Sequence, residues 1–155
     1  MGIGYDVHIL ADGESLVLGG VKIPHDKGIQ GHSDGDVLIH AVVDALLGAA
    51  GLGDMGKFFP SYDDTWKDIS SLLFLEKSAE KLLSAGMEIV NVDSTIIIQE
   101  PRITPHKDKM IKKMAGALSV DPDRISIKAT TTDGLGITGR GEGVAALAVV
   151  SLKAS

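Results

Sequence analysis

Three side chains in the N-terminal third of the sequence have the types and spacing of metal ligands. Asp6 and His8 are two residues apart in a predicted strand, so both point to one face. His40 belongs to a polar stripe, with Asp36 and Asp44, on an otherwise apolar predicted helix. If strand and helix pack together, one oxygen and two nitrogens suit Zn²⁺ with an open fourth position. Each part also has a structural interpretation, because a D-x-H triplet is common and helical histidines often belong to the core.

A second cluster, His32-Ser33-Asp34, comes directly before that helix. Backbone amides at a helix N-terminus bind anions, and His32 or Ser33 could add further donors. The alternative is that Ser33 is only the N-cap, in an S-x-x-D capping pattern with Asp36. The sequence alone favours this N-cap interpretation.

Hydroxyl groups gather in a third cluster, at the end of a predicted strand near the C-terminus. Thr130, Thr131 and Thr132 are followed by Asp133 and a glycine-rich stretch. Hydroxyls and free amides can bind phosphates, and Asp133 could hold a hard cation between them. The alternative is a threonine-rich strand that ends in a long turn. Residues 99–102 are either a strand-to-helix connection or part of a pocket whose backbone recognises a base.

The segment from Gly51 to Lys57 matches most of a phosphate-binding P-loop motif. The next residue is Phe58, which has no hydroxyl for Mg²⁺, and the segment follows a predicted helix rather than a strand. These differences exclude a P-loop nucleoside triphosphatase and leave a ligand loop lined by backbone.

The elements that must position these residues show both strand and helix patterns. Strands are predicted over residues 3–10, 88–99, 124–132 and 143–152, with a hairpin over 15–23 that turns at Gly19-Gly20. Helices are predicted over 36–49 and 68–85, with a third that opens at Thr104-Pro105, and residues 51–67 are expected to be irregular. We predict an α/β (α+β) fold with a single catalytic domain over residues 1–155. It would have one mostly four-stranded sheet, helices packed on one face and a small β-hairpin.

Composition narrows the class of protein. The 155 residues are 44% hydrophobic and 23% charged, as in an ordinary globular domain. A net charge of -6 disfavours nonspecific nucleic-acid binding, and the absence of cysteine excludes disulfides, thiolate catalysis and cysteine-ligated zinc. No apolar run approaches the roughly 18 residues of a membrane span. We therefore expect no nucleic-acid or membrane partner and a soluble protein with a cytoplasmic or organelle-matrix location.

Taken together, the motifs resemble those of the 2-C-methyl-D-erythritol 2,4-cyclodiphosphate synthase family of non-mevalonate isoprenoid biosynthesis. The matching segments are GYDVH (4–8), GGVKIP (19–24), residues 31–60, residues 91–106 and IKATTTDGLGITGRGEG (127–143). The resemblance implies a CMP-forming phosphorus–oxygen lyase that acts on 4-diphosphocytidyl-2-C-methyl-D-erythritol 2-phosphate. The 2-phosphate would attack the β-phosphorus, so that the cyclic diphosphate forms and CMP leaves. The resemblance also implies homotrimers with active sites between subunits.

The resemblance assigns roles to individual residues. Zn²⁺ would bind Asp6, His8 and His40, and a second cation, Mg²⁺ or Mn²⁺, would bind Asp133. His32 and Thr131 resemble the pair that stabilises the transition state. The positions that resemble the family's methylerythritol phosphate site are Ser33, Asp54, Met55, Gly56, Phe59, Pro60, Ser61, Tyr62 and Asp63. Those that resemble its cytidine and diphosphate site are Ile98, Gln99, Glu100, Pro101, Arg102, Ile103, Thr104, Thr130 and Thr132.

Several positions depart from the family pattern. The start around Gly2 is altered, Asp133 stands where Glu is usual, Ser61 replaces a frequent Asp, and Ile137 replaces a frequent Phe. The shorter Asp133 predicts a second cation that lies farther away or is bridged by water. Ile137 and Arg140 correspond to positions near a cavity on the family's threefold axis, where isoprenoid diphosphates bind.

Two other functions compete with the lyase. A zinc-dependent phosphate-ester hydrolase would give a linear product and would need a general base beside the metal, for which the sequence offers only aspartates. A non-catalytic isoprenoid-diphosphate-binding protein would be expected to lose metal ligands that this chain keeps. For the lyase, we hypothesise that Asp36 or Asp44 orients His32 or His40 through a hydrogen bond.

Overall fold

The computed structural model describes residues 1–155, and a five-stranded sheet in the order β4-β1-β7-β5-β6 organises the chain. Its strands are β1 (Gly2–Asp12), β4 (Lys27–Ile29), β5 (Met87–Ile97), β6 (Ile125–Thr130) and β7 (Gly143–Ala154). Strands β5 and β6 run parallel, and every other pair in the sheet is antiparallel. Strand β7 lies in the middle, as its run of apolar residues on both faces predicts.

A two-stranded hairpin, β2 (Leu16–Leu18) and β3 (Val21–Ile23), forms a separate small sheet. Its turn is at Gly19 and Gly20, whose φ angles of 58° and 74° are in the left-handed region that favours glycine. The predicted hairpin is therefore confirmed, with its turn at the predicted pair.

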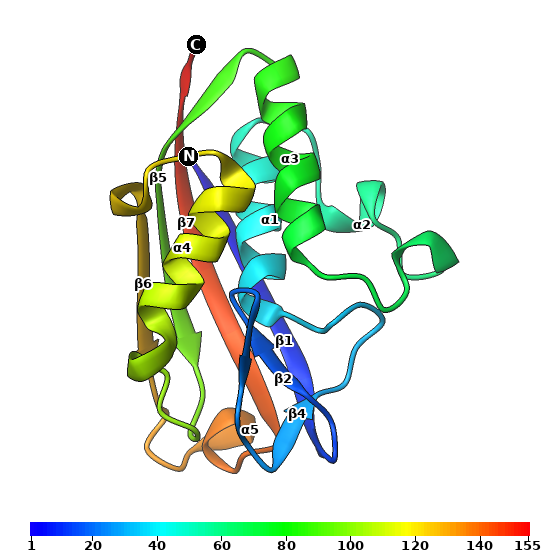
Figure 1. Ribbon diagram of the computed structural model, residues 1–155, viewed down its shortest axis with the longest axis vertical. Helices are drawn as coiled ribbons and strands as arrows, with labels where there is room; N and C mark the ends of the chain where they lie inside the picture. Colours follow the sequence, from blue (N-terminus) through cyan, green and yellow to red (C-terminus); the bar gives the residue numbers. More distant parts are fainter.

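Three long helices pack on one face of the sheet (Figure 1). They are α1 (Val37–Ala49), α3 (Leu72–Ser84) and α4 (Lys107–Leu118). Helix α1 is buried on nearly all sides because it lies against β1 and β7 and is in turn contacted by α3. The short helices are α2 (Met55–Phe58) and α5 (Gly136–Gly139), with 3₁₀ turns η1 (Asp64–Trp66), η2 (Thr104–His106) and η3 (Pro122–Arg124).

Helix α1 approaches β1 unusually closely, and glycine makes this possible. A Cβ atom on Gly4 would overlap the carbonyl oxygen of Ala41, and one on Gly2 would overlap that of Ala45. Small residues therefore face one another across the contact, with no side chain between the two backbones. This close contact brings the side chains that follow Gly4 on β1 against α1.

The face of the sheet opposite the helices carries an apolar surface. Alternate residues of β1 and β7 point outward there, and Ile3 pairs with Val149 while Tyr5 pairs with Leu147. Ile3 is 69% exposed and Tyr5 is 56% exposed. We call this surface the open face, and its large apolar members are Ile3, Tyr5, Val7, Ile9, Leu147 and Val149.

The predicted fold class is confirmed: one sheet, helices on one face and a small hairpin. The structure adds the three-residue strand β4 at the edge of the sheet, where the sequence analysis predicts no strand. Helix α3 begins at Leu72 rather than near residue 68, because Asp68 adopts a positive φ and interrupts the helix. The helix predicted from Thr104 begins with the η2 turn and continues as α4. No helix is long and apolar enough to span a membrane.

Candidate active site

Asp6, His8 and His40 converge between β1 and α1, as the sequence predicts. The Nε2 atom of His8 lies 2.8 Å from Oδ2 of Asp6. The Nδ1 atom of His40 lies 3.1 Å from each of these two atoms. The three side chains meet because positions 6 and 8 share the helix-facing side of β1, and because α1 packs closely on that strand.

The charges of these groups are coupled. Burial alone would raise the pKa of Asp6, but hydrogen bonds and positive charge from His40 and His8 lower it to about 2. Burial would lower the pKa of His8, yet the hydrogen bond and charge of Asp6 leave that pKa raised above its ordinary value. A hydrogen bond to the backbone of Gln30 raises the pKa of His8 further.

These donor atoms fit a divalent cation. In a tetrahedral site with bonds of about 2.0–2.1 Å, neighbouring ligand atoms are about 3.3 Å apart. The observed separations of 2.8–3.1 Å need only a small expansion to reach that geometry. Two imidazole nitrogens and one carboxylate oxygen are also the donor set of catalytic metal sites that keep one position open.

The other ring nitrogen of His40 has partners that the sequence analysis missed. Its Nε2 atom lies 3.0 Å from Oγ of Ser71 and 3.2 Å from Oγ of Ser33. The hydroxyl of Ser71 donates to Oδ1 of Asp34. Ser71 immediately precedes α3, so in the sequence it has the pattern of an ordinary N-cap and gives no further signal.

The hypothesis that Asp36 or Asp44 orients a histidine is wrong. Asp36 is fully buried and is itself the N-cap of α1, where it accepts from the Ile39 amide and from both amides of the Gly19-Gly20 turn. Asp44 accepts a hydrogen bond of 2.7 Å from the amide of Met55. The N-cap interpretation of Ser33 is also wrong, since its hydroxyl faces His40.

Other predicted substrate-binding residues surround this cluster. His32 lies with its Nε2 atom 3.4 Å from the carbonyl oxygen of Asp63. Phe59 is buried, stacks on Phe74 and meets Trp66 edge-on, which fixes the segment after α2 beside the cluster. The side chains of Ser61 and Tyr62 are exposed. We call these residues the metal group, and it comprises Asp6, His8, His32, Ser33, His40 and residues 54–63.

A separate group of predicted residues forms where β5 and β6 end. The amide of Ile98 donates to the carbonyl oxygen of Thr130, and the amide of Gly134 donates to Oε1 of Gln99. We call residues 98–104 and 130–134 the threonine group. The side chains of Ile98 and Ile103 belong to the core, so at these two positions only backbone is left to meet a ligand.

Thr130, Thr131 and Asp133 of the threonine group are exposed, whereas Thr132 is half-buried. Thr131 and Asp133 contact each other, with Oγ1 of Thr131 3.4 Å from Oδ1 of Asp133. Asp133 has a φ of 53°, a left-handed conformation that aspartate tolerates better than most residues. Thr132 donates to the carbonyl oxygen of Leu135 and contacts the hydroxyl of Thr138, and no hydrogen bond joins the threonine group to the metal group.

Ile137 and Arg140 lie just beyond the threonine group. Ile137 helps to line a hollow of about 310 Å³ beside the open face, together with Val7, His8, Ile9, Glu142 and Gly143. Arg140 forms an ion pair with Glu142 at 2.9 Å, and both side chains are about half exposed.

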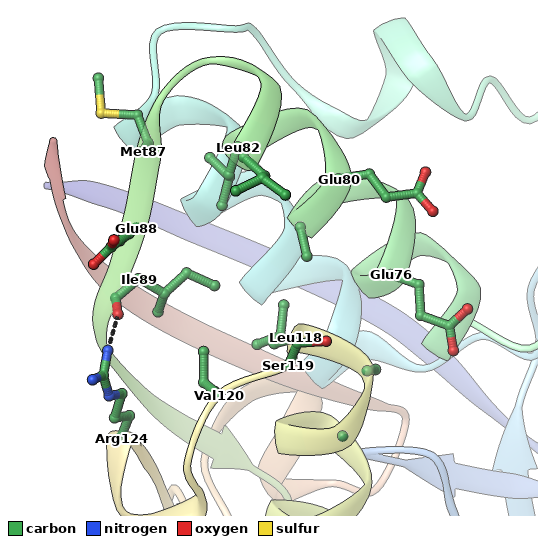
Figure 2. A pocket seen from close by; sticks show the side chains of 14 residues that line it. Glu76, Glu80, Leu82, Met87, Glu88, Ile89, Leu118, Ser119, Val120 and Arg124 are labelled. Carbon is green, nitrogen blue, oxygen red and sulfur yellow. Dashed lines mark hydrogen bonds between the residues drawn. The ribbon is translucent and has the colours of Figure 1, made fainter. Parts of the chain in front are cut away.

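A cavity of about 550 Å³ lies elsewhere in the molecule. Figure 2 shows it between the C-terminal half of α3, the start of β5 and the end of α4, where Arg124 donates to the carbonyl oxygen of Ile89. None of the predicted site residues lines this cavity. The candidate site is therefore defined by its convergent side chains and not by this cavity.

Comparisons with known proteins match the whole chain. A curated relative from Desulfatibacillum aliphaticivorans, named 2-C-methyl-D-erythritol 2,4-cyclodiphosphate synthase, is 54% identical over 99% of both chains. The bifunctional IspDF structure from Campylobacter jejuni matches with a TM-score of 0.95 and 42% identity, over 99% of this chain and 42% of that chain. A CDP complex of IspF from Plasmodium falciparum matches with a TM-score of 0.87 and 33% identity, over 99% of this chain and 95% of that chain. The sequence model of the YgbB family matches residues 1–153, and the chain therefore belongs to the YgbB family.

Proposed function

We propose that this protein is a CMP-forming lyase that makes 2-C-methyl-D-erythritol 2,4-cyclodiphosphate. Its substrate is 4-diphosphocytidyl-2-C-methyl-D-erythritol 2-phosphate. An oxygen of the 2-phosphate attacks the β-phosphorus, the bond from that phosphorus to the bridging oxygen breaks, and CMP leaves with that oxygen. The observation that carries this proposal is the convergence of Asp6, His8 and His40 in a chain that matches synthases of this name over its full length.

The metal group binds and orients the methylerythritol phosphate end of the substrate. Two phosphates must approach each other, so the main tasks are to offset charge and to align the reacting atoms. His32 and Ser33 face this site from the segment before α1, and the aromatic contacts of Phe59 hold the segment after α2 in place. When bound, Zn²⁺ at Asp6, His8 and His40 supplies a Lewis acid to a phosphate oxygen.

The threonine group binds the cytidine and diphosphate end. Its hydroxyls and backbone amides suit phosphate oxygens, and Thr131, whose side chain is exposed, would stabilise the developing charge. Asp133 is the residue that would hold Mg²⁺ or Mn²⁺. The relative from Plasmodium falciparum is described as a CDP complex, which supports a nucleotide site in this family.

The active protein is a homotrimer whose subunits cover the open face. An apolar surface made of Ile3, Tyr5, Leu147, Val149 and their neighbours is typical of an interface rather than of a surface in contact with water. Active sites between subunits would combine the metal group of one chain with the threonine group of the next. The hollow beside Ile137 and Arg140 would then lie at the centre, where an isoprenoid diphosphate could bind. Its bacterial relatives support a cytoplasmic bacterial enzyme.

Phosphorus NMR tests the proposal directly. Zinc-loaded protein is incubated with the substrate and Mg²⁺, and two coupled cyclic-diphosphate resonances are expected to appear together with CMP. Inorganic phosphate or a linear diphosphate would instead identify a hydrolase. An unchanged spectrum, with zinc bound, would identify a binding protein.

A further inference from the structure

Ser71 occupies the N-cap position of α3, but its side chain does not cap the helix. A serine at this position normally accepts a hydrogen bond from an amide of the first helical turn. Ser71 precedes α3, but its hydroxyl makes no capping hydrogen bond, and the residue is completely buried. The hydroxyl instead lies between His40 and Asp34. A buried polar group that gives up its local partner indicates a different role.

We propose that Ser71 and Asp34 are positioning residues for the metal ligand His40, in a chain that runs from Asp34 through Ser71 to the imidazole. This inference rests on the metal site of the proposed function. It assigns to these two residues the orienting role that the sequence had suggested for Asp36 or Asp44.

The donors and acceptors allow only one direction for the hydrogen bonds that join His40, Ser71 and Asp34. His40 presents Nδ1 to Asp6 and His8, so a metal bound there leaves the proton on Nε2. The Nε2 atom is 3.0 Å from Oγ of Ser71, so the Ser71 hydroxyl accepts a hydrogen bond from this N–H group. The single Ser71 proton must go elsewhere, and the carboxylate of Asp34, which can only accept, takes it. These two hydrogen bonds thus fix both the tautomer and the orientation of the His40 imidazole ring.

Asp34 holds Ser71 at two points. One carboxylate oxygen accepts from the Ser71 hydroxyl, and the other accepts from the Ser71 amide at 2.9 Å. The first oxygen also accepts from the amide of Asp36 at 3.1 Å. Asp34 therefore ties the start of α3 to the start of α1, which carries His40, and it keeps the hydroxyl at a fixed place against the imidazole.

Ser33 is the other possible partner of Nε2 of His40, but its contact is longer, less buried and not supported by a carboxylate. Its Oγ atom is 3.2 Å from Nε2, and no carboxylate holds its proton. It is also only partly buried, whereas Ser71 is fully buried.

Metal affinity tests this inference without any need for turnover. Zinc affinity is measured by competition with a chromophoric chelator, and the Co²⁺-substituted protein is examined by visible absorption. We expect Ser71→Ala to lose about 10–100-fold in zinc affinity and to alter the Co²⁺ bands. Ser71→Thr keeps the hydroxyl and is expected to retain most of the affinity. Ser70→Ala removes the exposed neighbouring hydroxyl and is expected to match the wild type.

A double-mutant cycle tests whether Asp34 acts on His40 through Ser71 or whether the two residues have independent structural roles. Asp34→Asn is expected to lower zinc affinity less than Ser71→Ala, because the amide oxygen can still accept one hydrogen bond. If the two act in series, adding Asp34→Asn to Ser71→Ala causes no further loss. Should Ser71→Ala fail to fold, as judged by circular dichroism, the loss in Asp34→Asn and its altered Co²⁺ spectrum carry the test.

The outcomes that overturn the inference are distinct from those that overturn the proposed function. A wild-type protein that binds no zinc refutes the metal site itself. A wild type that binds zinc, beside a folded Ser71→Ala variant with equal affinity and an unchanged Co²⁺ spectrum, refutes only the positioning role. Additive losses in the cycle, or a larger loss in Ser33→Ala than in Ser71→Ala, also refute it.

Discussion

The metal group and the threonine group differ in how completely one chain builds them. In the metal group His40 has partners on both ring nitrogens, and Asp6 and His8 contact each other and His40 between the packed elements β1 and α1. In the threonine group Thr131 and Asp133 are exposed and contact mainly each other. The chain therefore preorganises one half of its proposed site, and under the proposed function the substrate, a cation and a neighbouring subunit would complete the other half.

Removal of a metal ligand should produce the largest effect. His40→Ala takes away one of three donors and leaves Asp6 and His8 facing each other without the third. We expect loss of bound zinc and a fall in turnover of about 10³-fold or more, since Lewis-acid stabilisation amounts to several kcal/mol. Metal content by atomic absorption and CMP release are the measurements. His25→Ala is the control, and equal zinc content in His40→Ala and the control would disprove the assigned site.

The close contact of β1 and α1 should be the next most sensitive feature. Gly4→Ala would force the new methyl group into the Ala41 carbonyl, and α1 must move away from β1. We expect a loss of about 2–3 kcal/mol in the free energy of unfolding, as in other overpacked contacts. Zinc affinity should fall as well, because His40 moves with α1. Urea unfolding and chelator competition measure the two effects.

Gly48→Ala is the matched control for this substitution. A Cβ atom at Gly48, on the same helix, meets nothing within 4 Å. This variant should gain roughly 0.5–1 kcal/mol, because alanine is the better helix former. Equal stability of the Gly4 and Gly48 variants would show that the close approach does not position the metal group.

The convergence of Asp6, His8 and His40 could be predicted because two of the residues share one face of a strand and the third lies on the polar stripe of a helix. The two-residue separation of Asp6 and His8 and the helical position of His40 both survive in the structure. The supporting contacts of this cluster were missed because they join residues far apart in sequence, as Ser71 and Asp34 are to each other. Asp36 and Asp44 share the helical stripe of His40, but their carboxylates accept from amides of the Gly19-Gly20 turn and of Met55. The spacing of polar residues along a helix shows which of them share a face of that helix, but it does not show which group each side chain contacts.

The threonine group offers the opposite case. Its hydroxyls and glycines were visible in the sequence, and the structure places them at the ends of β5 and β6 as expected. The burial of Ile98 follows the strand alternation of Val92 and Ile96, but the spacing could not show that Ile103 enters the core, since a loop gives no period that separates inward from outward residues. The open face was equally hidden, because outward apolar residues of β1 have the pattern of an ordinary buried strand.

Substitution in the threonine group should leave zinc binding intact. Asp133→Ala removes the proposed ligand of the second cation, and we expect the Mg²⁺ concentration for half-maximal turnover to rise roughly tenfold, equivalent to about 1.4 kcal/mol. Asp133→Glu restores the residue usual in the family and should lower that concentration by less than this, because its backbone must keep a φ of 53°. A loss of zinc in Asp133→Ala would contradict the separation of the two groups.

The smallest expected effect is a difference in pH dependence between the two groups. In the metal-free protein the raised pKa of His8 stabilises the fold at pH below the ordinary histidine pKa, and this contribution is lost as pH rises. The lowered pKa of Asp6, about 2, stabilises the fold above the ordinary aspartate pKa, and this contribution is lost as pH falls. The pair is therefore most stabilising in mildly acidic solution.

Zinc competes with the protons on the histidines, so its stabilising effect must grow with pH. We expect the zinc-induced increase in Tm to be a few degrees larger at pH 8 than at pH 6, and Asp133→Ala to show the same profile as the wild type. A profile that is flat in the wild type, or that changes in Asp133→Ala, would mean that the coupled charges of Asp6 and His8 do not control metal binding.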